Sequence, residues 1–143
     1  MGLLLQVHDW WRWAVLILAV IVLVKSLLGW LGKRPFTKLD DQLGQAYTVA
    51  FDIQVLVGLI LWVFGPMGLR TLSQSMSNSQ LRFIVVEHGV LAILALVFAH
   101  VGRSRSKNAK LFDEVRHRSA FIFYLLSFIA LALIWLLPMM MGG

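Results

Sequence analysis

The sequence predicts an all-α integral membrane protein, a four-helix up-down-up-down bundle, from its composition and from four long apolar segments. Of the 143 residues, 59% are hydrophobic and only 14% are charged. A soluble domain is about half apolar and about a quarter charged. Each apolar segment is close to the roughly 20 residues that cross a bilayer as a helix. We therefore expect residues 1–143 to form a single transmembrane domain.

The four predicted spans are separated by short polar connections. Their approximate ranges are 10–31, 43–64, 81–101 and 120–137. Helix is the regular structure open to them, because four isolated strands cannot close a barrel and satisfy their backbone groups in lipid. No basic stretch precedes the first span and no small-residue cleavage site follows it, so we expect a membrane helix there rather than a cleavable signal peptide.

Lysine and arginine gather on one side of the predicted bundle. Ten lie near the first and third connections: Lys25, Lys33, Arg34, Lys38, Arg103, Arg105, Lys107, Lys110, Arg116 and Arg118. The other side has three, namely Arg12, Arg70 and Arg82. Basic loops face the cytoplasm, which predicts a multi-pass membrane protein with both termini on the extracytoplasmic side. Membrane lipids then explain the net charge of +6, and no nucleic-acid partner is expected.

Two histidines identify the first candidate site. An ionisable residue in a span costs several kcal/mol unless it is paired, hydrated or used. His88 lies inside the third span and His8 just before the first. These two spans run in the same direction and are diagonal neighbours in an up-down bundle, so the two imidazoles can face each other across its centre. Neutral imidazole is the common protein ligand of haem iron, which predicts one haem b with His8 and His88 as axial ligands.

Three charged residues accompany these histidines. Arg12 follows His8 by four residues and shares its helical face, where it can pair with a haem propionate. Arg82 can do the same from the third span, and Glu87 can tune the site beside His88. In the alternative interpretation, Glu87 and His88 form a structural hydrogen-bonded pair and His8 is an ordinary interfacial residue.

The other two histidines and one acidic residue suggest further hypotheses. His100 and His117 could hold a second haem at the inner side, but His100 lies about 120° around the helix from His88 at 100° per residue. One haem therefore fits better than two, and His117 can instead bind lipid phosphate or cap the fourth helix. Asp52 and Lys25 fall at similar depths, which predicts an intramembrane ion pair. In the sharper alternative, Asp52 and Gln54 handle a proton or a quinone headgroup.

Several local patterns point to a known family. They are His8 with Trp11-Arg-Trp13, residues 25–38 (Lys-Ser-Leu-Leu-Gly-Trp-Leu-Gly-Lys-Arg-Pro-Phe-Thr-Lys), Asp52-Ile-Gln-Val-Leu-Val-Gly58, Val86-Glu-His88, Ala99-His-Val-Gly-Arg103 and His117-Arg118. Over most of its length the chain resembles small bacterial four-helix membrane proteins labelled "cytochrome B". This resemblance implies a b-type haem protein of the bacterial inner (cytoplasmic) membrane.

The first functional hypothesis is a membrane electron-transfer protein or subunit that holds haem b. No catalytic motif is present, so we expect no enzyme activity of the chain alone and a redox partner for any reaction. The second hypothesis is a haem-free accessory or assembly subunit of a larger respiratory or photosynthetic membrane complex. The third is a small proton or ion pathway that uses Asp52 and Glu87. Association into a homo-oligomer is compatible with each. The absence of cysteine excludes covalent c-type haem attachment.

Overall fold

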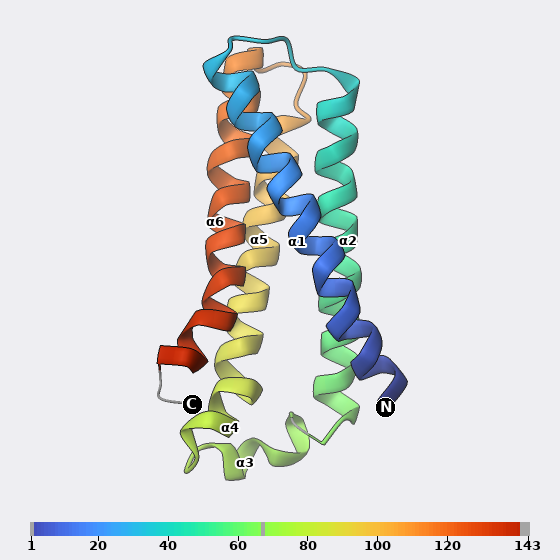
Figure 1. The fold of residues 1–143 in the computed structure, drawn as a ribbon, viewed down its shortest axis with the longest axis vertical. Coiled ribbons are helices and arrows are strands. Elements are labelled where there is room, and N and C mark those ends of the chain that lie inside the picture. Colours follow the sequence, from blue (N-terminus) through green and yellow to red (C-terminus); the bar gives the residue numbers. More distant parts are fainter. Residues whose placement is uncertain (1, 67, 141–143) are drawn as a thin grey trace.

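A computed structural model describes residues 2–66 and 68–140, and its regular structure over these residues is helical (Figure 1). The long helices are α1 (Gly2–Leu31), α2 (Lys38–Phe64), α5 (His88–Ser106) and α6 (Asp113–Met140). Within the described residues, four helical stretches are long and apolar enough to cross a membrane. The prediction of four apolar helices suited to a membrane bundle is confirmed.

The third stretch, Ser79–Ser106, is not a uniform α-helix. It begins with α4 (Ser79–Arg82), continues through the π-helical segment η2 (Phe83–Glu87) and becomes α5. Before it, the short helices η1 (Leu69–Thr71) and α3 (Leu72–Ser75) form the connection from α2. The side chain of Asn78 caps α4 by accepting from the backbone N–H groups of Gln80 and Leu81, which fixes where the third stretch starts.

The helices extend beyond the predicted spans. Helix α1 begins at Gly2 instead of near residue 10, so the prediction that His8 precedes the helix was wrong. Polar residues lower the hydropathy of this segment, but contacts with α2 keep it helical. The indole of Trp11 donates to the carbonyl of Ala50 at 2.7 Å, and Gln54 donates to the carbonyl of His8 at 2.8 Å.

Each long helix packs against two neighbours. Helix α1 contacts α2 and α6, and α5 contacts the same two helices, so α1 and α5 lie diagonally across the bundle (Figure 1). Small residues at the centre let the backbones approach closely: Ala19, Ala50, Ala95, Ala99 and Ala120 are all buried. Tyr47 of α2 reaches across this centre, where its hydroxyl lies 2.7 Å from that of Ser127 on α6.

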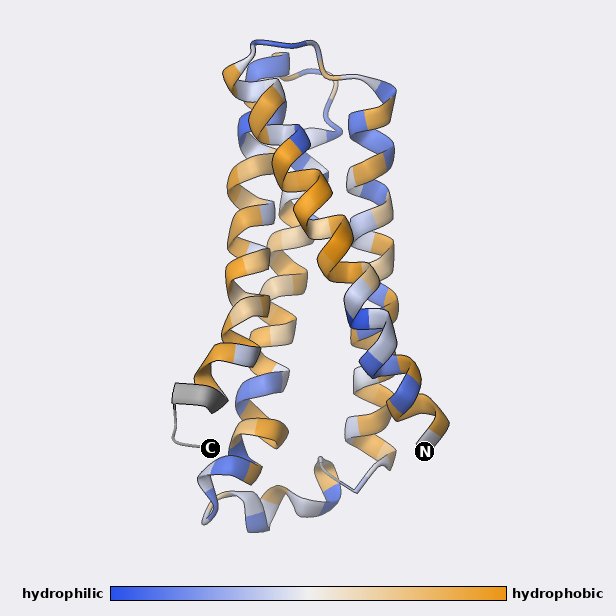
Figure 2. Ribbon diagram, in the orientation of Figure 1, coloured by the Kyte–Doolittle hydropathy of each residue, from blue (hydrophilic) through white to orange (hydrophobic). Residues whose placement is uncertain are grey.

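Hydrophobic residues predominate along the middle of the long helices, and hydrophilic residues are more frequent towards their ends (Figure 2). Each long helix contributes exposed large apolar side chains, for example Ile17, Leu56, Ile93 and Ile129. An apolar surface of this extent is unfavourable in water. It suits contact with lipid hydrocarbon, as expected for a membrane protein.

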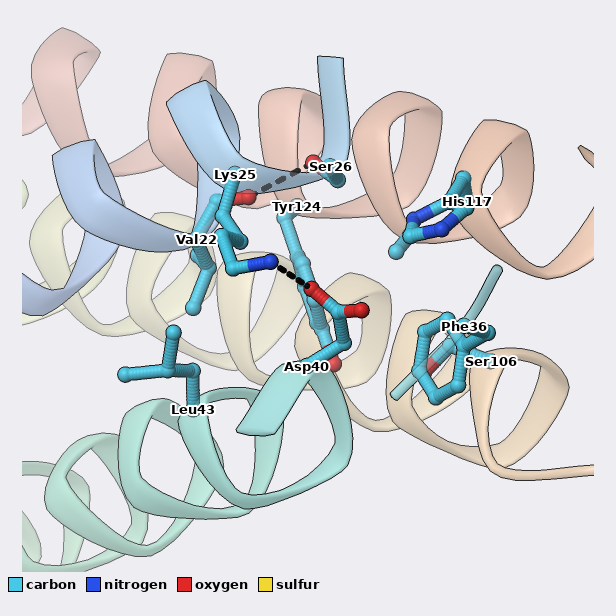
Figure 3. A pocket seen from close by; sticks show the side chains of 10 residues that line it. Val22, Lys25, Ser26, Phe36, Asp40, Leu43, Ser106, His117 and Tyr124 are labelled. Carbon is cyan, nitrogen blue, oxygen red and sulfur yellow. Dashed lines mark hydrogen bonds and ion pairs between the residues drawn. The ribbon is translucent and has the colours of Figure 1, made fainter. Parts of the chain in front are cut away.

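A polar cluster joins the helices at the end where α1 meets α2 (Figure 3). The Lys25 ammonium lies 2.8 Å from the carboxylate of Asp40, whose side chain is only 4% exposed. Asp40 also accepts from the backbone N–H and hydroxyl of Thr37 and completes the capping box of α2. The predicted ion pair between Lys25 and Asp52 was wrong, because Asp40 at the start of α2 takes the place of Asp52.

Candidate functional site

His8 and His88 face each other across the diagonal of the bundle. Their ring centroids are 6.2 Å apart and the ring planes are tilted by 49°. A metal–imidazole bond is about 2 Å long, and the ring centre lies about 1 Å behind the nitrogen. Two imidazoles on opposite sides of one metal therefore have centroids about 6 Å apart. The structure brings together the two predicted ligands at a separation that suits one metal atom between them.

Helix α2 provides the space for the His8 ring. A Cβ atom at Gly58 would lie 3.2 Å from Cε1 of His8, so any larger residue at this position would press on the imidazole. Gln54, one turn earlier, holds the backbone of His8 through its hydrogen bond to the carbonyl oxygen. The Nδ1 atom of His8 is buried and has no hydrogen-bond partner in the described part of the chain. A metal bond or a water molecule would satisfy such a nitrogen.

His88 follows directly after the π-helical segment η2. Its backbone N–H donates to the carbonyl of Phe83, five residues earlier, and this wider turn changes the direction in which the following side chains point. The indole of Trp62 on α2 donates to the carbonyl of Val85 inside η2 at 2.7 Å. Short π-helical segments are frequent at functional sites. Here the irregular turn immediately precedes the candidate ligand.

Arg12 lies one turn after His8 on α1. Its guanidinium carbon lies 5.4 Å from the ring centroid of Trp13 and 5.2 Å from that of Trp135 on α6. These residues and Ile134 line an open hollow of about 330 Å³. The Nε atom of Arg12 is buried without a hydrogen-bond partner among the described residues. Arg12 thus contributes a cationic side chain to the lining of the hollow, and a guanidinium can pair with an acidic group.

Arg82 and Glu87 pair with each other. The distance from Nε of Arg82 to Oε1 of Glu87 is 2.8 Å, and the two side chains are 44% and 35% exposed. The guanidinium of Arg82 is therefore already paired with a carboxylate of the protein. The sequence had suggested that it would be available to pair with a haem propionate. Glu87 bonds to Arg82, and no bond from it to His88 is seen in the described residues. The alternative of a Glu87–His88 structural pair is wrong.

His100 and His117 have different partners and do not form a pair. His100 lies 2.6 Å from Asp52 of α2. His117 is 1% exposed, its ring centroid lies 5.1 Å from that of Phe36 with the planes tilted by 55°, and its Nε2 lies 3.3 Å from the carbonyl oxygen of Pro35. The structure therefore gives no ligand pair for a second haem. It also shows His117 as a buried packing residue rather than a lipid-phosphate ligand.

The donor set suits a prosthetic group better than a bare ion. Among the described residues, no group of three or more His, Cys, Asp or Glu side chains could hold a metal ion. A haem needs only axial ligands from the protein, since the porphyrin supplies the four equatorial nitrogens. Two facing imidazoles are sufficient for this purpose. The two imidazoles are the donor set that a haem would need from the protein.

Sequence reasoning missed two features of this site. Gly58 lies in an apolar helix, where an isolated glycine often marks a close approach, and this signal could have indicated that a side chain packs against it. The π-helical segment η2 has no such signal, since Phe83–Glu87 reads as an ordinary apolar helical segment.

Comparison with protein-family models, with curated proteins and with solved structures found no match to this chain.

Proposed function

We propose that the protein binds one haem b between His8 and His88 and carries electrons within a membrane. The observation that supports this most is the 6.2 Å separation of the two imidazole centroids. It comes from residues 80 positions apart in the sequence, on helices that are diagonal in the bundle. Placing two imidazole rings together within apolar helices costs free energy unless the rings are paired or used. Shared ligation of one iron atom would offset this cost.

Each part of the site has a task in this proposal. The imidazoles of His8 and His88 would hold the iron, Gly58 would leave room for the His8 ring, and the guanidinium of Arg12 would pair with a propionate. A bound haem supplies reversible one-electron chemistry. The surrounding apolar side chains would keep water away and so influence the potential. In this proposal the electron passes to a redox partner.

The visible spectrum tests the proposal directly. Protein expressed with adequate haem supply and purified in detergent is expected to show b-type bands in the reduced-minus-oxidised difference spectrum, at about one haem per chain. Helix content measured by circular dichroism would verify that the fold is intact. Folded protein without any haem would contradict the proposal. If it also co-purified with a larger membrane complex, the accessory-subunit hypothesis would replace it.

We further propose that the bundle crosses a bacterial inner membrane as up-down-up-down, with the Lys- and Arg-rich connections in the cytoplasm. The chain contains no cysteine, so single cysteines report topology without background. Cysteine at Lys107, in the third connection, should react with a membrane-impermeant maleimide only in inside-out vesicles. Cysteine at Ser77, in the second connection, should react only from the periplasmic side. Labelling from the opposite sides would invert the proposed orientation.

Gly58→Val tests whether α2 shapes the site. A side chain here would push on the His8 ring, and overpacking of this kind costs about 1–3 kcal/mol, which corresponds to about fivefold to hundredfold weaker haem binding. Gly89→Val is the matched control, because a Cβ at Gly89 meets no heavy atom within 4 Å. Haem titration of the apoproteins should separate the two variants. Equal affinities would show that Gly58 does not position His8.

A further inference from the structure

Asp52 and His100 form a polar pair on the outer surface of the bundle. The carboxylate Oδ1 lies 2.6 Å from the imidazole Nε2, and the two side chains are 44% and 51% exposed. Asp52 is the fifteenth of the 27 residues of α2, so the pair lies near the middle of the helix. Exposed apolar side chains surround it on both helices: Val49, Ile53 and Leu56 on α2, and Ile93 and Val97 on α5.

This position is unfavourable for two polar side chains. Groups exposed at mid-depth in a membrane face hydrocarbon, which offers them no hydrogen bonds. Ionisable residues inside membrane segments usually point into the bundle or into a water-filled cavity. Asp52 and His100 satisfy each other only in part, because each retains one further nitrogen or oxygen for hydrogen bonding. A ligand that enters from the lipid and hydrogen-bonds to the pair would offset this cost.

The surroundings define the chemistry of that ligand. It must dissolve among acyl chains, and it must carry a polar group that can both accept and donate hydrogen bonds, since an imidazole–carboxylate pair can give or take a proton. The pair also lies near the proposed haem site. Gly58, which contacts the His8 ring, is six residues from Asp52, about 9 Å along the helix at 1.5 Å per residue. A lipid-soluble carrier of electrons and protons meets all three conditions.

We propose that Asp52 and His100 bind the headgroup of a lipid-soluble quinone, with its tail along the apolar surface of α2 and α5. This inference rests on the proposed haem function for its redox role. Oxidation of one quinol breaks two O–H bonds and converts both ring hydroxyls to carbonyls. The two electrons need two one-electron acceptors, which haem held by His8 and His88 would supply in two separate transfers. The two protons leave through His100, one with each electron, and Asp52 stabilises the imidazolium.

Binding is measured first without any dependence on haem. Wild-type protein in nanodiscs is titrated with tritiated decylubiquinone and, separately, with a short-chain menaquinone, and uptake by empty nanodiscs is subtracted. We expect saturable binding at about one quinone per chain with at least one of the two headgroups, and comparison of the headgroups identifies the class. The absence of saturable binding with both would overturn the proposal.

Substitutions of Asp52 and His100 test whether these two residues form the quinone site. Asp52→Ala and His100→Ala should each weaken binding at least tenfold, whereas Ile17→Ala, at an exposed apolar position on α1, should leave it unchanged. Circular dichroism and elution volume verify folding and oligomeric state. If the two variants bind as wild type does, the site lies elsewhere. If they instead change the oligomeric state while wild type binds no quinone, the pair is a contact between copies of the chain.

The redox role is tested in a second experiment. Haem-loaded wild type is mixed with decylubiquinol and reduction is followed in the visible spectrum. Asp52→Asn, which keeps the hydrogen bond but not the charge, should slow reduction at least tenfold with an unchanged haem spectrum. A protein that binds quinone but no haem would disprove the electron-transfer function and leave the quinone site standing. A protein that binds haem but no quinone would disprove the quinone site and leave the proposed haem function standing.

Discussion

Replacement of His88 by alanine is expected to abolish haem binding. The imidazole of His88 is one of the two rings that lie 6.2 Å apart, and its loss would leave one axial position without a protein ligand. His8→Ala should have the same effect for the same reason. The b-type bands of the purified variants should fall to background, while helix content and expression stay near those of wild type. Rebinding of haem on addition of free imidazole would show that the cavity itself is intact.

His100→Ala is the matched control for this prediction. It removes an equally large imidazole from the same helix, but His100 is half-exposed and pairs with Asp52, away from His8. Its haem content should equal that of wild type. Loss of half the haem in this variant would instead support the two-haem hypothesis. An unchanged spectrum in His88→Ala would show that the ligand had been wrongly assigned.

Asp40→Ala is expected to cause the largest loss of stability. The substitution removes the ion pair with Lys25 and both hydrogen bonds to Thr37. It also leaves a partly buried ammonium without its partner. Breaking a buried ion pair costs about 3–5 kcal/mol, and loss of a helix cap costs about 1 kcal/mol. Because Lys25 is 33% exposed, we expect a decrease of about 3 kcal/mol in the free energy of unfolding, measured by titration with SDS in bicelles.

Asp113→Ala provides the comparison for this measurement. Asp113 also lies in the first turn of a long helix, but its carboxylate is 49% exposed and 3.8 Å from Arg116. An exposed pair of this kind contributes about 0–1 kcal/mol. Similar losses in the two variants would show that burial of Asp40 is not the cause. A Lys25→Met and Asp40→Ala double mutant with purely additive effects would show that the ion pair contributes nothing.

The positions of the helices could be predicted from the sequence better than the side-chain contacts between neighbouring helices. Hydropathy and charge locate spans, because each span must match the thickness of the bilayer. They do not give the rotation or tilt of a helix about its neighbours. Lys25 was therefore assigned to Asp52 on depth alone, although the start of α2 brings Asp40 within 2.8 Å of it. The partner of Asp52 in the structure is His100, which the sequence had suggested only as a possible ligand of a less favoured second haem.

The candidate haem site was predicted in outline. His8 and His88 were paired because an up-down bundle sets the first and third spans on a diagonal, and the structure places their rings together. The hydrogen bond between Arg82 and Glu87 could not be foreseen, since it depends on the local path of the chain through η2. The isolated glycine at position 58 indicates a close approach, but the sequence does not show that the His8 ring is the group that packs against it.

The π-helical segment η2 has a consequence for how tolerant this part of the chain is to changes in length. A π turn contains one residue more than the α turn it replaces, so deletion of one residue between Phe83 and Glu87 would allow a regular α-helix. Every side chain before the deletion would then rotate by about 100° relative to those after it. The carbonyl of Val85 that accepts from Trp62 would also return to the helix. The direction in which the His88 side chain projects thus depends on the number of residues in η2 more than on their identity. Insertions and deletions should therefore be tolerated less well in this segment than substitutions.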